Sequence, residues 1–123
     1  MNKNGGVVRI GDFVYGHSDN SNGWVCLDFK KGGEPLWANK GVGGMGSISA
    51  ADGMLYCYAE GDGTCALVKA TPDKYDEVSR FKIPGKSAIR PGSGKVWAHP
   101  VVANGKLFLR DYEKLFVFDI AAE

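Results

Sequence analysis

The sequence lacks the features that mark a membrane protein or a nucleic-acid-binding protein. No apolar run approaches the roughly 18 residues that a membrane span needs, and residues 1–6 lack the apolar core of a signal peptide. Lys and Arg number 15 against 14 for Asp and Glu, so the formal net charge is only +1 and no basic face is offered to nucleic acid or anionic lipid. We therefore expect neither a membrane span nor a nucleic-acid partner.

Cysteine is also scarce. The chain has 3 cysteines, Cys26, Cys57 and Cys65, and none of them forms a C-x-x-C pair. An odd number does not fit the even disulfide framework of a small secreted domain. We predict buried free thiols.

Glycine, in contrast, is abundant. The 18 glycines in 123 residues amount to roughly twice the average share of about 7 per cent. Hydrophobic residues make up 44% and charged residues 24% of the chain, which is ordinary for a globular protein. The composition predicts a turn-rich but globular chain, of a length that fits one domain or a piece of a larger one.

Three segments repeat one pattern, in which an apolar strand, a tight turn and an aromatic-containing strand follow one another. Their turns contain Asp52-Gly53, Asn104-Gly105 and, in reversed order, Gly11-Asp12. These residue types adopt the positive φ of two-residue hairpin turns. The pattern predicts three β-hairpins, over residues 7–15, 49–56 and 101–108.

Each hairpin is followed by a polar turn and a third strand, and the first two units continue into a fourth strand. We expect third strands at 24–28, 64–68 and 114–119, and fourth strands at 34–37 and 77–83. This makes about eleven strands in three units, the last of which lacks its outer strand. The units are placed at about residues 5–43, 44–96 and 97–123, with a polar insertion at 86–95 in the second.

The repeat defines the expected fold class. No segment has the 3.6-residue apolar rhythm of a helix, so the chain is predicted to be all-β. Four-stranded antiparallel units that recur about every 40 to 50 residues are the signature of β-propeller blades. The prediction is a partial β-propeller of about three blades.

The segment Trp24–Trp37 contains an aliphatic-Asp pair, Leu27-Asp28, then the glycine turn Gly32-Gly33 and a tryptophan. It resembles the blade motif of the pyrroloquinoline-quinone-like (PQQ-like) β-propeller repeat, and Trp97–Ile120 resembles the closing blade of exported bacterial members. The resemblance implies an exported or periplasmic parent protein, although this chain shows no signal peptide. It also implies that the tryptophans pack on neighbouring blades. The aromatic residues predicted to pack between blades are Trp24, Trp37, Trp97, Phe81 and Phe118.

The same fold serves quinone-dependent dehydrogenases and non-catalytic proteins, so the fold does not settle the function. The resemblance implies, for the quinone enzymes, a vicinal cysteine pair and a calcium-binding Glu, Asn and Asp set. No two cysteines are adjacent here, and no acidic cluster has calcium-loop spacing. We therefore predict no cofactor, no metal and no catalytic residue, and favour a module for protein interaction or scaffolding. The alternative is a truncated piece of a quinone- or sugar-linked dehydrogenase.

Three blades cannot close a ring, since propellers have about four to eight blades. The faces of the first and third units would then be left as apolar surfaces. Two copies of the chain would supply about six blades and complete a ring as a homo-oligomer. Missing N-terminal blades of a longer chain would cover the same surfaces, and the sequence leaves both possibilities open.

Few residues suggest a ligand site. His99, Arg110 and Asp111 have side chains that bind anions or polar ligands, and they fall near the expected central channel, so they are the predicted ligand-binding residues. His17 is expected to be a loop residue. The two histidines have no cysteine or carboxylate nearby at ligand spacing, which argues against a metal site.

Overall fold

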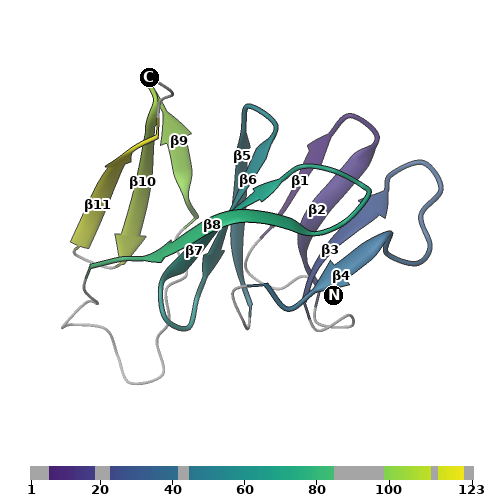
Figure 1. Cartoon of the computed structure of the whole chain (residues 1–123), viewed down its shortest axis with the longest axis horizontal. Coiled ribbons are helices and arrows are strands. Elements are labelled where there is room, and N and C mark those ends of the chain that lie inside the picture. The colour runs from purple at the N-terminus through teal and green to yellow at the C-terminus, as the bar shows by residue number, and fades with distance from the viewer. Residues whose placement is uncertain (1–5, 19–22, 42–44, 85–98, 112–113, 121–123) are drawn as a thin grey trace.

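The computed structural model describes residues 6–18, 23–41, 45–84, 99–111 and 114–120. Within these ranges the chain forms eleven strands and no helix, which confirms the all-β class. The strands form three separate antiparallel sheets (Figure 1).

Sheet A contains β1 (Val7–Ile10), β2 (Phe13–Ser18), β3 (Gly23–Asp28) and β4 (Trp37–Asn39). Sheet B contains β5 (Gly46–Ala51), β6 (Met54–Ala59), β7 (Thr64–Lys69) and β8 (Asp76–Lys82). Sheet C contains β9 (Val101–Ala103), β10 (Lys106–Asp111) and β11 (Lys114–Asp119).

The three predicted hairpins are confirmed. β1 pairs with β2, β5 with β6, and β9 with β10, each through a two-residue turn. Asp52 and Asn104 adopt positive φ angles of 51° and 52°, and the glycine after each follows at 72° and 71°. This pair of positive φ angles is what a type I′ turn requires, and it matches the twist of the strands on either side. The turn residues therefore set the strand register in these two sheets.

One strand lies later in the chain than expected. The fourth strand of the first unit was expected at residues 34–37, but β4 runs from Trp37 to Asn39 and pairs with β3 through Cys26 and Trp37. Gly32 and Gly33 both have positive φ, which prolongs the turn, and Pro35 has no N–H to donate to a ladder. Regular pairing therefore begins only at Trp37.

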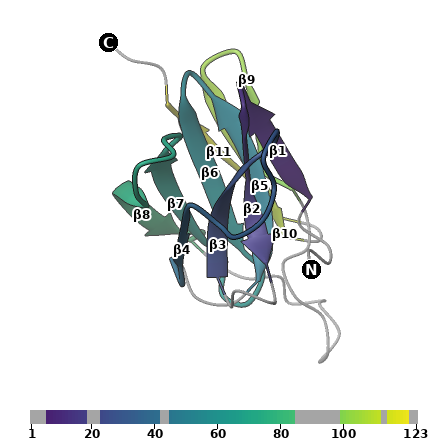
Figure 2. The ribbon, with the colours of Figure 1, turned by 90° about the vertical axis from the view of Figure 1, so that its right-hand side faces the viewer.

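The sheets stand side by side, and their first strands are next to one another. β5 of sheet B contacts β1 of sheet A and β9 of sheet C. Figure 2, viewed from one end of the row, shows the sheets stacked behind one another. Each sheet is open in the described part of the chain, and none curls into a barrel. Face-to-face packing of consecutive sheets therefore builds the core.

Two apolar clusters fill the spaces between sheets. The first joins sheets A and B and contains Tyr15, Trp24, Cys26, Ile48, Leu55, Cys57, Ala59, Ala66 and Val68. The second joins sheets B and C and contains Tyr56, Tyr58, Cys65, Ile83, Leu107 and Leu109. Sheet B contributes to both clusters because successive side chains of a strand point to opposite faces. The middle sheet is thus covered on both faces.

Candidate functional site

The alternation of side chains gives each sheet two faces, which we name by the direction of the chain. The leading face is the one that carries the third residue of the second strand, which is Tyr15 in sheet A, Tyr56 in sheet B and Phe108 in sheet C. The trailing face carries the next residue of that strand, which is Gly16, Cys57 or Leu109. In sheets A and B the leading face turns toward the following sheet, and in sheets B and C the trailing face turns toward the preceding one. The leading face of sheet A carries Tyr15, Trp24 and Cys26, and that of sheet B carries Tyr56, Tyr58 and Cys65. The trailing face of sheet B carries Ile48, Leu55, Cys57 and Val68, and that of sheet C carries Leu107 and Leu109.

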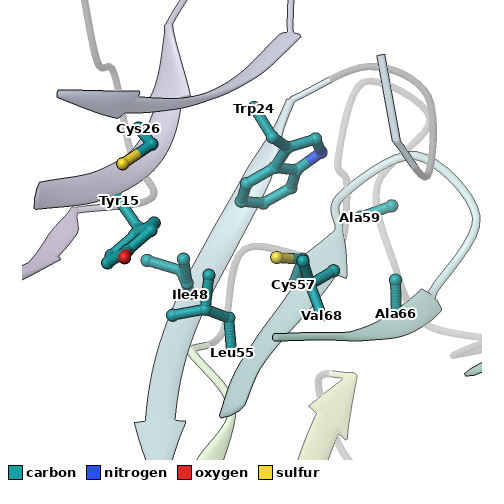
Figure 3. Packing of buried hydrophobic residues seen from close by; sticks show 9 residues of the cluster. All are labelled: Tyr15, Trp24, Cys26, Ile48, Leu55, Cys57, Ala59, Ala66 and Val68. Atoms are coloured by element: carbon teal, nitrogen blue, oxygen red, sulfur yellow. The ribbon is translucent and has the colours of Figure 1, made fainter. Parts of the chain in front are cut away.

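The contact between sheets A and B is a close-packed apolar layer. Figure 3 shows side chains of both sheets in one cluster, with Tyr15 beside Ile48 and Leu55. Trp24 is 2% exposed, and its indole Nε1 has no hydrogen-bond partner. Burial, together with the neighbouring Cys26 thiol, raises the pKa of Tyr15 to about 12. The centre of this interface is therefore held by apolar burial.

Trp37 of β4 joins the outer edges of sheets A and B. Its Nε1 donates a hydrogen bond of 2.8 Å to the carbonyl oxygen of Thr71, between β7 and β8. Its ring packs edge-on against Tyr75, with centroids 5.6 Å apart, and lies 6.1 Å from the ring of Tyr15. A tryptophan supplies both a large apolar area and one directed donor, and here both act on the neighbouring sheet.

A polar network supports this edge. The Tyr75 hydroxyl donates to Glu77 Oε1 at 2.7 Å, and Arg80 donates to both carboxylate oxygens of Glu77 at 2.7 Å. Arg80 also donates to the carbonyl oxygen of Gly41, which follows β4 of sheet A. The hydrogen bonds from Arg80 and Tyr75 hold the pKa of Glu77 below its usual value despite partial burial. The network therefore links the outer strands of sheets A and B.

The contact between sheets B and C repeats the same face-to-face arrangement. Phe81 of β8 and Phe118 of β11 have ring centroids 4.7 Å apart, and Leu107 and Leu109 are fully buried beneath them. The Ser49 hydroxyl donates to the carbonyl oxygen of Pro100, so the first strands are also tied together. In both interfaces a leading face therefore packs on a trailing face.

The leading face of sheet C is covered by no other described residue. Val101, Leu115 and Val117 are 53%, 60% and 50% exposed. Phe108 is paired with Val101 and Val117 in the ladders and is half-buried between them. These four residues form a continuous apolar surface across three strands. Surfaces of this kind mark interaction sites in soluble proteins.

The trailing face of sheet A is the second uncovered surface. Val7 is 58% exposed, and Phe29, beyond the end of β3, is 54% exposed beneath the guanidinium of Arg9. A hollow of about 190 Å³ lies on this face. It is lined mainly by Val7, Val14, Gly16, Val25 and Leu27. The two outermost faces of the row thus both carry exposed apolar side chains, with Arg9 and Arg110 beside them.

The structure separates the predicted ligand-binding residues between two faces. β9 begins opposite Phe108, so His99, just before β9, and Arg110, near the end of β10, lie at the same end of sheet C. Both are exposed. Asp111 is 1% exposed and belongs to the opposite face, because neighbouring strand residues alternate. The His99 ring lies near the start of sheet A, since a Cβ on Gly6 would be 3.4 Å from His99 Cε1. The role of His99, Arg110 and Asp111 in ligand binding stays a prediction.

Two further sequence expectations concern single side chains. His17 was expected in a loop, but it belongs to β2, is 7% exposed and packs edge-on against Trp24 at 5.5 Å. β2 is longer than expected. Gly16 and His17 have no strong strand preference of their own, but their pairing with β3 extends β2 to Ser18. Trp97 and the insertion at 86–95 lie outside the described residues.

The prediction of buried free thiols is confirmed. Cys26, Cys57 and Cys65 form no disulfide and are all buried. Burial raises the pKa of all three, that of Cys65 to about 12, so they stay protonated and unreactive at neutral pH. In the part of the chain that the structure describes, no group of three or more His, Cys, Asp or Glu side chains could hold a metal ion.

A groove of about 310 Å³ opens between sheets B and C. Its lining includes Met54, Tyr56, Leu67, Val102 and Ile120. It lies beside the β5–β6 and β9–β10 hairpin turns, since Asp52 and Gly105 also line it.

No protein-family model and no curated protein matches this chain. Among the described residues, no helix is long and apolar enough to cross a membrane. The candidate functional site therefore rests on the fold itself, as the two uncovered apolar faces at the ends of the row of sheets.

Proposed function

We propose that the chain is a non-catalytic β-propeller module of the PQQ-like repeat type, which serves protein interaction or scaffolding and associates with a second copy to complete a ring. Two copies of three sheets would supply six blades, within the usual range for propellers. The repeated strand and turn order, and the motif from Trp24 to Trp37, support this assignment.

The exposed apolar faces are the observation that carries the proposal. Val7, Leu115 and Val117 are all at least half exposed, and they lie on β1 and β11, the edge strands of sheets A and C. Full burial of a Val or Leu side chain contributes about 1.5–3 kcal/mol, so covering both faces would favour association substantially. The same faces, left in water, would promote aggregation.

Light scattering over a dilution series tests the association. We expect a stable particle of about twice the chain mass of 13.2 kDa, which dissociates only on strong dilution. Circular dichroism on the same samples checks that the chain is folded throughout. A folded monomer at all concentrations would contradict self-association, and the faces would then have to be covered by something other than a second copy.

A further inference from the structure

We propose that association is head-to-tail, with the leading face of sheet C on one copy packed on the trailing face of sheet A on the other. The inference rests on the proposed self-association and adds which surfaces meet. In a symmetric alternative, one patch would meet the identical patch of a second copy. The two arrangements bury different residues, so they can be distinguished.

The repeat shows that the leading face of sheet C is built as an interface. In the strand registers, Val117 pairs with Phe108 as Cys26 pairs with Tyr15, so Val117 and Cys26 hold the same repeat position. Cys26 is 0% exposed against sheet B, whereas Val117 is 50% exposed. In the same way, Leu115 of sheet C holds the repeat position of Trp24 in sheet A. Leu115 is 60% exposed, whereas Trp24 is 2% exposed.

The trailing face of sheet A has the corresponding property. Val7 pairs with Gly16 as Ile48 pairs with Cys57, so Val7 and Ile48 are equivalent. Ile48 is 4% exposed beneath sheet A, whereas Val7 is 58% exposed. Positions that are buried inside the row are therefore exposed at both of its ends.

The two internal interfaces indicate how these ends pair. Both consist of a leading face on a trailing face, and the chain leaves one face of each kind uncovered. A second copy can thus repeat a kind of contact that already occurs twice within the chain. A symmetric contact would instead have to pack two leading faces or two trailing faces together, which occurs nowhere among the described sheets. This is why we choose a second copy as the occupant.

The shapes of the two faces agree with this pairing. Gly16 lines the hollow on sheet A and contributes no side chain to it. The equivalent positions in sheets B and C are filled by Cys57 and Leu109. The leading face of sheet C instead projects Leu115 and Val117. A hollow matches projecting side chains better than it matches a second hollow.

Two single substitutions separate the arrangements. Val117→Asp places a charge on the leading face of sheet C, and Val7→Asp places one on the trailing face of sheet A. The control is Val78→Asp on β8, since Val78 is 52% exposed and belongs to neither of the two faces. All three positions are exposed, so each variant is expected to fold, which circular dichroism verifies.

Light scattering of each variant, alone and mixed, gives the answer. We expect Val117→Asp and Val7→Asp each to raise the dissociation constant of the dimer about 100-fold, because a charge is buried in the contact, and Val78→Asp to leave it unchanged. Mixing the two defective variants should restore a heterodimer, weaker than the wild-type dimer, because the intact leading face of one meets the intact trailing face of the other.

A symmetric contact predicts a different pattern and would overturn the inference. In that case one of the two variants would dimerise like the wild type, the other would stay monomeric, and mixing would add nothing. A wild-type chain that is itself monomeric would instead contradict the proposed function. Wild-type particles that grow steadily with concentration would support the head-to-tail contact and contradict only the closed two-copy ring.

Discussion

Trp37 and Thr71 are 34 residues apart in the chain, yet the Trp37 indole nitrogen donates a 2.8 Å hydrogen bond to the Thr71 carbonyl oxygen. The bond joins the last strand of sheet A to the connection between the last two strands of sheet B. Because Tyr75 packs edge-on against the same indole, one side chain fixes the spacing of two sheets at their outer edges.

Replacing Trp37 tests this role. Trp37→Phe keeps an aromatic ring but removes the donor, which leaves a partly buried carbonyl oxygen without its partner. We expect the free energy of unfolding to fall by about 1–3 kcal/mol, measured by urea denaturation. Leu36→Ala is the control, because Leu36 is 48% exposed and should change stability by less than about 0.5 kcal/mol. Equal effects of the two substitutions would contradict the role of the hydrogen bond.

Two glycines of one turn offer a second test. Gly63 has a φ of +75°, and a Cβ there would lie 2.6 Å from Ile83 Cγ1, whereas a Cβ on Gly61 would meet nothing within 4 Å. We expect Gly63→Ala to lower the unfolding free energy by about 1–3 kcal/mol through strain and crowding. Gly61→Ala should be neutral or slightly stabilising. Thermal unfolding of both variants measures the difference, and similar melting temperatures would refute it.

The hydrogen bonds to Glu77 predict a pH dependence. They hold its pKa below the usual value, so the stability that they contribute is present above the unfolded pKa of about 4.3 and is lost as the pH falls through the folded pKa. Glu77→Gln should cost about 1 kcal/mol at pH 7, and the difference from the wild type should shrink in acid. Denaturation at several pH values checks this, with the exposed Glu34→Gln as control. A difference independent of pH would contradict it.

The buried thiols predict slow chemical labelling. Cys57 and Cys65 are 2% and 0% exposed, and burial raises the pKa of both. We expect an aromatic disulfide reagent at pH 8 to react with the folded chain at least about 100-fold more slowly than with the unfolded chain. All three thiols should react in denaturant. Fast labelling of the folded chain, at a rate unaffected by stabilising conditions, would show that the thiols are accessible.

Local chemistry explains which features could be predicted. Asp52-Gly53 and Asn104-Gly105 set two hairpins because their positive φ angles depend on the turn residues alone. The start of β4 was misplaced because it depends on pairing with β3 across a long turn. His17 was misassigned for a similar reason, since its strand is extended by β3 and its ring is buried against Trp24.

The sequence by itself thus determined the all-β class, the hairpin turns and the presence of buried free thiols, because turn chemistry and two-residue alternation act over a few residues. Alternation says that a strand has two faces, but it does not say what each face meets. Only the tertiary structure decided that leading faces pack on trailing faces, that Arg110 and Asp111 point apart, and that Val7 and Val117 lie at the uncovered ends. These relationships depend on contacts between sheets, which no local pattern encodes.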